Sequence, residues 1–487
     1  MEEENQNLNP NGDERQSDPK RQKMTMTMTT TPLLHNGIPI TAGISSCSHS
    51  LMESESDKKV LARCCHNYFL PDELWVEIMS WLPVKSLFSC KCVQKSWRHL
   101  INTLIHDQTF VTKHLLNNNS TTATPSLFIT CCHGDFRKAQ NSFLTITCNE
   151  KEDARHTDHL ETIIRDFDLS ILGQQQKYLL SLPGAYCNGI LCIPIFRQNN
   201  NILLCNPALR EFKLIIGSCF GHWRRIERKR ILGFGHDSID NVYKVVRVAC
   251  ESGLLGAEIH TLGVDRYDSW RRINIDLPEF YTSRTPPLMC QELQCKRIIY
   301  WFASGCYNGK PVILSFDLHV EKFQTISLPS LDDDLSTTET CSVIRYKLAL
   351  WKESVALFKF HAPRCRCGKR STCISPKPIE MWVMDESSKG PEERYFWTKH
   401  LTIPPPLKQF CCPEIFWKDD ELILMSYSHS TDRSRRVPLV SVYNLSTQKV
   451  KSLHGIPENL YEIGSFAFVE SLVSVSHDSA LAKEQLG

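Results

Sequence analysis

The chain has 487 residues, of which 41% are hydrophobic and 23% are charged, a composition typical of globular proteins. Its 56 basic and 54 acidic residues nearly cancel, so no overall charge favours nucleic acid or an anionic membrane as a partner. No run of about 18 apolar residues is present, so we predict no membrane-spanning helix. The length accommodates one large domain with a small one, or two or three ordinary domains.

The first 65 residues contain no aromatic side chain and are rich in Asn, Thr, Ser, Glu and Lys. Such a segment cannot bury enough apolar surface to offset its ordering entropy, so we predict a disordered tail over residues 1–65. The N-terminus is acidic and lacks an apolar core, so we expect neither a secretory signal nor a transit peptide. We therefore expect the 22 cysteines to be reduced, and many of them to be buried as small hydrophobes.

Residues 66–106 are predicted to form a module of short helices. The first helix begins at Leu70-Pro71 and ends before Pro83, because proline is tolerated in a first turn and not in a helix interior. At 100° per residue, apolar side chains fill an arc of roughly 220° around this helix, about twice that of an ordinary surface helix.

Two arrangements would bury so wide an apolar surface. In the first, the helix packs on its sister helices and on the chain's own β-domain. In the second, part of the arc is kept for another protein. A unit of about 40 residues between polar segments seldom builds a sufficient core alone, which favours the protein partner.

The module carries a set of residues at characteristic spacing. They are Leu70-Pro71, Glu73-Leu74, Glu77-Ile78, the run LPVKSL from Leu82 to Leu87, Val93, Lys95, Trp97 and Leu100-Ile101. Together they resemble an F-box motif. The resemblance implies a three-helix module that docks on a Skp-type adaptor, which bridges to a cullin–RING ubiquitin ligase.

The resemblance also implies which side chains hold the adaptor through apolar burial. These are Leu70, Pro71, Leu74, Ile78, Leu82, Pro83, Leu87, Val93 and Trp97. Three residues depart from the family pattern: Met79 replaces the usual Leu, with conserved volume, Trp81 occupies a position that is commonly polar or basic, and Cys90 one that is commonly aromatic or basic. We expect these departures to modulate the affinity for the adaptor.

A polar, low-complexity stretch follows the module, and we expect residues 107–126 to be a linker. From residue 127 to residue 475, helical periodicity gives way to strand-like segments rich in β-branched and aromatic side chains. We expect residues 476–487 to be a C-terminal tail.

One pattern recurs in this strand-rich region: an apolar strand, a polar turn and a second short strand. It occurs at residues 202–215, 256–278, 312–329, 379–403 and 440–453. The starts fall roughly 55–65 residues apart, close to the ~50 of kelch-type propeller blades. We therefore predict a large all-β, kelch-like β-propeller after a small all-α module, with a pair of irregular β-sandwiches as the alternative.

Further segments carry landmarks in a fixed order along the strand-rich region. They are residues 188–193, 203–215, 233–248, 268–273, 298–303, 315–329, 379–384 and 470–475. In this order they resemble the plant-type F-box-associated domain, which is kelch-related. With the F-box, the resemblance covers residues 68–475.

One segment contains four candidate zinc ligands, namely His361, Cys365, Cys367 and Cys373. Their spacing lacks the paired knuckles of common structural zinc sites, and we interpret the segment as a polar loop.

Two other segments carry chemically active side chains. Residues 223–230 (WRRIERKR) form a basic patch that suits nuclear import or anion binding, and we interpret it as a solvated loop. Cys132, His133 and Asp135 are neighbours in sequence, but catalytic groups are defined by geometry in space. We predict no catalytic constellation.

The two resemblances imply a non-catalytic substrate-recognition subunit of an SCF-type (Skp–cullin–F-box) E3 ubiquitin ligase. The F-box would hold the adaptor, and the β-domain would recruit a target protein of unknown identity for ubiquitination and proteasomal degradation. We expect no cofactor, metal, nucleic acid or membrane among its ligands, and a cytoplasmic or nuclear location. The alternative is a β-propeller that binds a glycan or a small ligand and carries a vestigial F-box.

Overall fold

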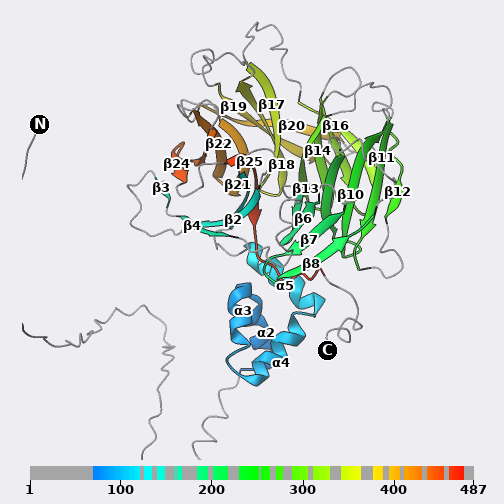
Figure 1. Cartoon of the computed structure of the whole chain (residues 1–487), viewed down its shortest axis with the longest axis vertical. Coiled ribbons are helices and arrows are strands. Elements are labelled where there is room, and N and C mark those ends of the chain that lie inside the picture. The colour runs from blue at the N-terminus through cyan, green and yellow to red at the C-terminus, as the bar shows by residue number, and fades with distance from the viewer. Residues whose placement is uncertain are drawn as a thin grey trace, which may run out of the picture. The chain divides into compact units, whose positions relative to one another are not determined.

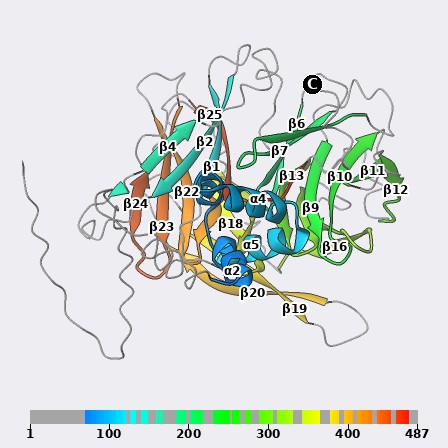
Figure 2. The same cartoon turned by 90° about the horizontal axis from the view of Figure 1, so that it is seen from below.

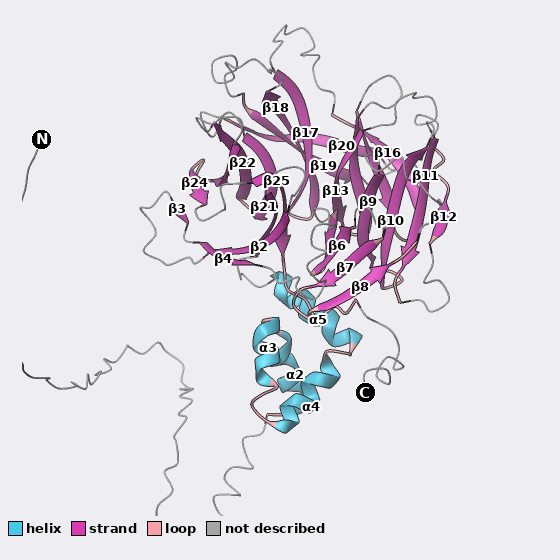
Figure 3. Ribbon diagram, viewed as in Figure 1, coloured by secondary structure: helices cyan, strands magenta, loops and turns pink. Residues whose placement is uncertain are grey.

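The computed structural model describes a helical module and a set of β-sheets (Figures 1 and 3). The described residues are 70–120, 126–133, 140–148, 159–160, 162–166, 184–195, 201–217, 230–251, 254–263, 270–277, 288–304, 311–329, 342–363, 377–387, 394–405, 411–429, 436–453 and 460–475. The two predicted tails, residues 1–65 and 476–487, lie outside them. Within the described residues, no helix has the length and apolar character needed to cross a membrane.

The module contains helices α2 (Asp72–Ser80), α3 (Val84–Cys90), α4 (Lys95–Leu104) and α5 (Gln108–Ser120). Pro71 and Pro83 stand immediately before α2 and α3, with φ angles of −52° and −53°. A proline ring fixes φ close to these values, and its missing N–H costs nothing where no partner is available. The two Leu-Pro pairs therefore set the starts of the first two helices, as the sequence predicts.

Helix α5 lies where we expected a linker. Phe110, Val111 and His114 are buried, and Leu115 is half-buried. These positions follow the i, i+4 spacing of one helical face, which the polar run after residue 116 obscures in the sequence. The module thus has a fourth helix, and of the expected linker only residues 121–125 lie outside the described residues.

The strands form six sheets in the described part of the chain. The first sheet contains β5 (Ala185–Cys187), β6 (Ile190–Pro194), β7 (Ile202–Asn206) and β8 (Glu211–Ile215). The second contains β9 (Arg230–Asp237), β10 (Val242–Glu251), β11 (Leu254–Thr261) and β12 (Arg271–Ile273). The third contains β13 (Leu288–Cys295), β14 (Ile298–Ser304), β15 (Val312–Asp317) and β16 (Lys322–Ser327).

The remaining three sheets are also built from antiparallel neighbours, except that the fifth gains a parallel strand, and the sixth contains strands from both ends of the domain. The fourth contains β17 (Ser342–Trp351), β18 (Ser354–Pro363), β19 (Ile379–Ser387) and β20 (Arg394–Ile403). The fifth contains β21 (Cys411–Lys418), β22 (Glu421–His429), β23 (Arg436–Asn444), β24 (Val450–Leu453) and, parallel to β24, β3 (His159–Leu160). The sixth joins β25 (Leu460–Phe468) to β1 (Ser126–His133), β2 (Gln140–Cys148) and β4 (Thr162–Asp166).

The sheets are arranged around a common centre (Figure 2), and the first strands of neighbouring sheets contact each other. β5 contacts β9, β9 contacts β13, β13 contacts β17, β17 contacts β21, and β21 contacts β25. This arrangement is a β-propeller, and it excludes the pair of sandwiches. The five recurring hairpins of the sequence are the third and fourth strands of the first five sheets.

Apolar side chains fill the space between neighbouring sheets. One cluster draws on the second and third sheets and includes Val246, Ile299 and Trp301, each with at most 1% of its surface exposed. The Trp301 indole also donates a hydrogen bond of 3.1 Å to the Leu232 carbonyl of the second sheet. The blades are therefore held face to face by burial of large side chains.

The ring closes through chain segments from both ends of the domain. β1 pairs with β25 from Ser126↔Phe468 to His133↔Leu460, so N-terminal and C-terminal strands share one sheet. The rings of Phe466 and Phe468 then lie 5.9 and 5.7 Å from the ring of Tyr186 in β5. The ring is therefore closed by one sheet that contains strands from both ends of the domain.

A closing segment, residues 469–475, continues from β25 along the first sheet. The Asn206 side-chain amide donates to the carbonyls of Ser471 (3.1 Å) and Val473 (2.6 Å). The Ser471 hydroxyl donates to the Asn188 carbonyl at 2.6 Å. Ser471 and Asn206 are fully buried, so these bonds satisfy groups that have no access to water.

Four tight turns share one construction. Asn206, Asp237, Asp317 and Asn444 each accept backbone N–H groups two or three residues later through a side-chain oxygen. The residue four positions after each of them has a positive φ, between 54° and 58°: Arg210, Asn241, Glu321 and Gln448. Side chains of Asn and Asp stabilise turns in this manner, which explains the polar residues between the paired strands.

Candidate functional site

The outer face of α2 is the candidate site. We define it as Leu70, Leu74, Ile78 and Trp81, whose exposed fractions are 40%, 47%, 44% and 48%. The last three follow the i, i+4, i+7 spacing of one side of a helix. Four large apolar side chains at adjacent positions form a surface of the kind that marks protein interaction sites.

The opposite side of α2 builds the core of the module. Met79 has 1% of its surface exposed, and it belongs to a cluster with Val84, Leu87 and Ile101. Trp75 packs against Trp97 of α4, with ring centroids 5.0 Å apart. The wide apolar arc predicted from the sequence is therefore divided between an inner side that closes the module and an outer side that faces solvent.

The nine predicted adaptor-binding residues fall into three groups. Six have exposed side chains: Leu70, Pro71, Leu74, Ile78, Pro83 and Val93. Leu82 and Trp97 are half-buried. Leu87 has no exposed surface, because it lies in the core of the module, and so its role in this conformation is to support the helices.

A polar network borders the outer face. The Trp81 indole N–H donates to Oε1 of Glu77 at 3.0 Å, and the other carboxylate oxygen accepts from the Lys113 ammonium of α5. The hydrogen bond from Lys113, and then that from Trp81, lower the pKa of Glu77. The sequence does not reveal this network, because Lys113 lies within residues 107–126, which are predicted to be a linker.

Helix α5 also covers the end of α2. The buried His114 ring donates from Nε2 to the Leu82 carbonyl (2.9 Å), and Nδ1 accepts from the Asn118 amide (3.1 Å). Asn117 donates to the Ser80 hydroxyl at 2.8 Å. These bonds fit a neutral imidazole, and burial lowers the pKa of His114 despite the opposing effect of the Leu82 carbonyl.

The burial of His114 predicts a pH-dependent helix. An unfolded histidine takes up a proton below pH ~6.5, whereas the folded module keeps the ring neutral, so this stability is complete above pH ~6.5 and is lost as the pH falls. We expect the protection of α5 amides against hydrogen exchange to fall by up to about tenfold from pH 7.5 to pH 5.5, after correction for intrinsic rates. His114→Gln should abolish this pH dependence; an equal loss in both proteins would contradict the assignment.

Comparison with known proteins identifies both parts of the chain. Residues 69–108 match the F-box domain model, and residues 131–468 match the model of the F-box associated beta propeller domain. The second match alone covers more than half of the chain. The chain belongs to the family of F-box proteins that carry an F-box associated beta propeller.

The relatives are plant F-box proteins. The F-box protein DOR of Arabidopsis thaliana is 25% identical over 347 residues, which are 68% of this chain and 73% of DOR. A second Arabidopsis thaliana F-box protein is 24% identical over 345 residues, 69% of this chain and 71% of the relative. Two others from the same plant are aligned over 60% and 63% of their own lengths.

The solved structures that match the chain include two enzymes of low sequence identity. Prolyl oligopeptidase B from Galerina marginata aligns with 69% of this chain and 43% of its own, at 10% identity and a TM-score of 0.31. A luciferin-regenerating enzyme aligns over 69% of this chain and 96% of its own, at 13% identity and a TM-score of 0.30. At such scores these likenesses carry no argument about function.

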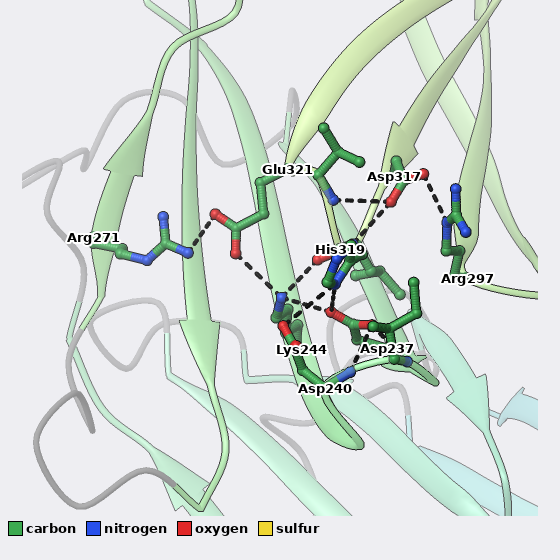
Figure 4. Close-up of polar contacts among 11 residues, drawn as sticks. Asp237, Asp240, Lys244, Arg271, Arg297, Asp317, His319 and Glu321 are labelled. Atoms are coloured by element: carbon green, nitrogen blue, oxygen red, sulfur yellow. Dashed lines mark hydrogen bonds and ion pairs between the residues drawn. The ribbon is translucent and has the colours of Figure 1, made fainter.

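Among the described residues of this F-box protein, a polar cluster in the propeller has the residue types of a metal site (Figure 4). Ligand atoms of Asp237, Asp240 and His319 lie within 4.8 Å of one another. However, the Lys244 ammonium donates to Oδ2 of Asp237 at 3.0 Å, and Oδ2 is also the oxygen that lies 3.4 Å from Nδ1 of His319. A bound cation would have to share that oxygen with a positive charge, so the cluster fits an ion-pair network better than a metal centre.

The same network joins two blades. Lys244 of β10 also donates to the Leu318 carbonyl (2.6 Å) and lies 3.2 Å from Oε1 of Glu321, both in the turn after β15. Burial alone raises the pKa of Asp237, but the Lys244 ammonium and two backbone N–H groups lower it to about 2. With two hydrogen bonds and an ion pair, Lys244 links the second and third sheets.

The other segments weighed in the sequence contribute no described site. The zinc-ligand candidates Cys365, Cys367 and Cys373 and residues 223–229 of the basic patch lie outside the described residues. So does Asp135, and the side chains of Cys132 and His133 are likewise not described.

Buried thiols are present in the first sheet of the propeller. Cys187, Cys192 and Cys205 have at most 5% of their surface exposed, and burial raises the pKa of Cys187 and of Cys205 to about 12. Such thiols remain protonated and act as small hydrophobic side chains. This is the role that we expected for many of the cysteines.

Proposed function

We propose that this F-box protein is a non-catalytic substrate-recognition subunit of an SCF-type E3 ubiquitin ligase. The observation that carries the proposal is the outer face of α2, which leaves four large apolar side chains in solvent within a chain of the F-box family. Burial of these side chains against a Skp-type adaptor would stabilise the complex by about 25 cal/mol for each Å² of apolar surface removed from water. The adaptor would in turn join the protein to a cullin–RING ligase.

The propeller would recruit the target protein. Closed blades make a rigid scaffold, and rigid scaffolds position binding loops without the entropy loss of ordering them. Transfer of ubiquitin would occur elsewhere in the complex, and it would gain from the high effective concentration of target lysines near the charged ubiquitin carrier. We propose a cytoplasmic or nuclear location for the complex.

Adaptor binding tests the proposal directly. We expect the purified full-length chain to bind a Skp-type adaptor with a Kd of micromolar or better, measured by calorimetry. Leu74→Asp places a charge at the centre of the outer face and should weaken binding by at least about 100-fold. Leu214→Asp is the matched control, because Leu214 is a comparably exposed leucine (45%) on β8 of the propeller.

Two results would reject the ligase function. The first is failure of the wild-type chain to bind any member of a panel of Skp-type adaptors. The second is an equal loss of affinity from Leu74→Asp and Leu214→Asp, which would show that the outer face has no special role. Either result would favour the alternative, a propeller that binds another ligand and carries a vestigial F-box.

A further inference from the structure

The structure assigns to Trp81 the role of an additional adaptor contact, held in place by Glu77 and Lys113. This inference rests on the proposed function and adds to it a residue at which this chain departs from the F-box pattern. Trp81 directly follows α2, and almost half of its surface (48%) faces solvent. It is the largest of the exposed side chains on the outer face.

The Trp81 side chain is held before any partner arrives. Its indole N–H donates to Glu77, and Glu77 is fixed in turn by the ion pair with Lys113. The indole therefore has a polar partner within the module, and its apolar ring can be buried by a partner without leaving the N–H unsatisfied. A side chain fixed in this way loses less conformational entropy on binding than a free one.

The backbone around Trp81 is fixed as well. Asn117 binds the Ser80 side chain on one side of it, and His114 binds the Leu82 carbonyl on the other. All three supporting contacts, including that of Lys113, come from α5, which begins where the match to the F-box model ends, at residue 108. Helix α5 thus contributes to the proposed adaptor interface indirectly, because its side chains hold Trp81 and the neighbouring backbone in place.

We expect Trp81 to contribute a large share of the binding free energy. Tryptophan is enriched among residues whose truncation costs the most affinity in protein interfaces, chiefly where a large ring is desolvated next to other apolar contacts. An adaptor that covers this side of α2 would desolvate the Trp81 ring next to Leu74 and Ile78, which are exposed on the same side. Glu77 and Lys113 are positioning residues, since they act on the partner only through the ring they hold.

The test measures the Kd of the full-length chain for a purified Skp-type adaptor. We expect Trp81→Ala to weaken binding by about 10- to 100-fold. Trp81→Phe keeps an aromatic ring without the N–H and should lie between wild type and Trp81→Ala. Val320→Ala, at an exposed apolar residue of the propeller (53%), is the control and should bind as the wild type does. Helical circular dichroism checks that each variant is folded.

A double-mutant cycle tests the positioning role. Lys113→Met should weaken binding several-fold in the wild-type background and have no further effect in the Trp81→Ala background. It should also reduce the salt dependence of the affinity, because the Lys113–Glu77 pair is exposed (45% for each side chain) and is screened by salt. Additive effects of Lys113→Met and Trp81→Ala would overturn the positioning role.

The outcomes separate this inference from the proposed function. If Leu74→Asp abolishes binding while Trp81→Ala binds as wild type, the Trp81 contact is wrong and adaptor binding stands. If the wild-type chain does not bind any adaptor, the proposed function and the Trp81 contact are both wrong. If Trp81→Ala and Lys113→Met weaken binding as expected, both are supported.

Discussion

Replacing Lys244 with methionine is expected to destabilise the propeller by about 3–5 kcal/mol. The Lys244 side chain is 5% exposed and its partner Asp237 is 0% exposed. Methionine fills a similar volume, but it leaves a carboxylate buried in the absence of its counter-charge. Loss of one member of a buried pair costs far more than the pair contributes when intact, because the remaining charge lacks both water and its counter-charge.

The measurement is the midpoint of urea unfolding of the full-length chain, followed by tryptophan fluorescence. Lys352→Met is the matched control, since the Lys352–Asp420 pair is 4.0 Å long and almost half exposed, and its loss should cost at most about 1 kcal/mol. Adding Asp237→Asn to Lys244→Met should recover part of the lost stability. Similar small effects of the two lysine substitutions would contradict the buried link.

The stability of the same variant should depend less on acid pH than that of the wild type. In the wild type, the pKa of Asp237 is lowered from 3.8 to about 2, so its contribution is complete above pH 3.8 and is lost as the pH falls toward 2. Lys244→Met removes the largest effect that lowers the pKa of Asp237, so this pKa lies higher in the variant than in the wild type. Acid titration of the unfolding midpoint should therefore show a smaller loss of stability between pH 3.8 and pH 2 in Lys244→Met, because less of the Asp237 contribution remains to be lost.

The second large effect is expected from Gly189→Ala, at about 2–4 kcal/mol. Gly189 has a φ of +82°, and a Cβ atom there would lie 2.4 Å from the Ser471 hydroxyl oxygen and 3.1 Å from the Ser471 backbone nitrogen. The closing segment would have to move away from β5 and β6. Its hydrogen bond to the Asn188 carbonyl would then be lost.

Gly263→Ala separates the effect of backbone strain from that of the clash with Ser471. Gly263 has nearly the same φ, +79°, but a Cβ atom there would have no neighbour within 4 Å. It should therefore cost only the backbone strain, about 1 kcal/mol. Hydrogen exchange of residues 469–475 should rise in Gly189→Ala and not in Gly263→Ala. Equal thermal midpoints for the two variants would show that the closing segment does not depend on its contact with Gly189.

Much of the architecture could be predicted from the sequence, because it depends on local signals. Leu-Pro pairs mark helix starts, and a turn residue such as Asn206 or Asp317 separates two apolar strands. The Asn188-Gly189 pair between two strands is likewise a hairpin signal, since both residues adopt positive φ. Each of these signals is read within a few residues.

The features that the sequence does not reveal depend on distant contacts. Helix α5 looks like a linker, because its buried residues are few and its last turn is a run of asparagines. The contact of Gly189 with Ser471 joins residues nearly 300 positions apart. In the candidate site, periodicity identified the apolar arc of α2, but only the folded module shows that Leu87 is interior and that Trp81 is held by α5.

The shared sheet of β25 and β1 has a consequence for the synthesis of the protein. About 330 residues separate the end of β1 from the start of β25, and ribosomes need roughly 20–60 s to add them. During that time the helical module has left the ribosome and β1 has no C-terminal partner. A nascent chain that stops before residue 460 therefore presents a complete F-box module together with a β1 edge that lacks its β25 partner, and such an unpaired edge favours aggregation.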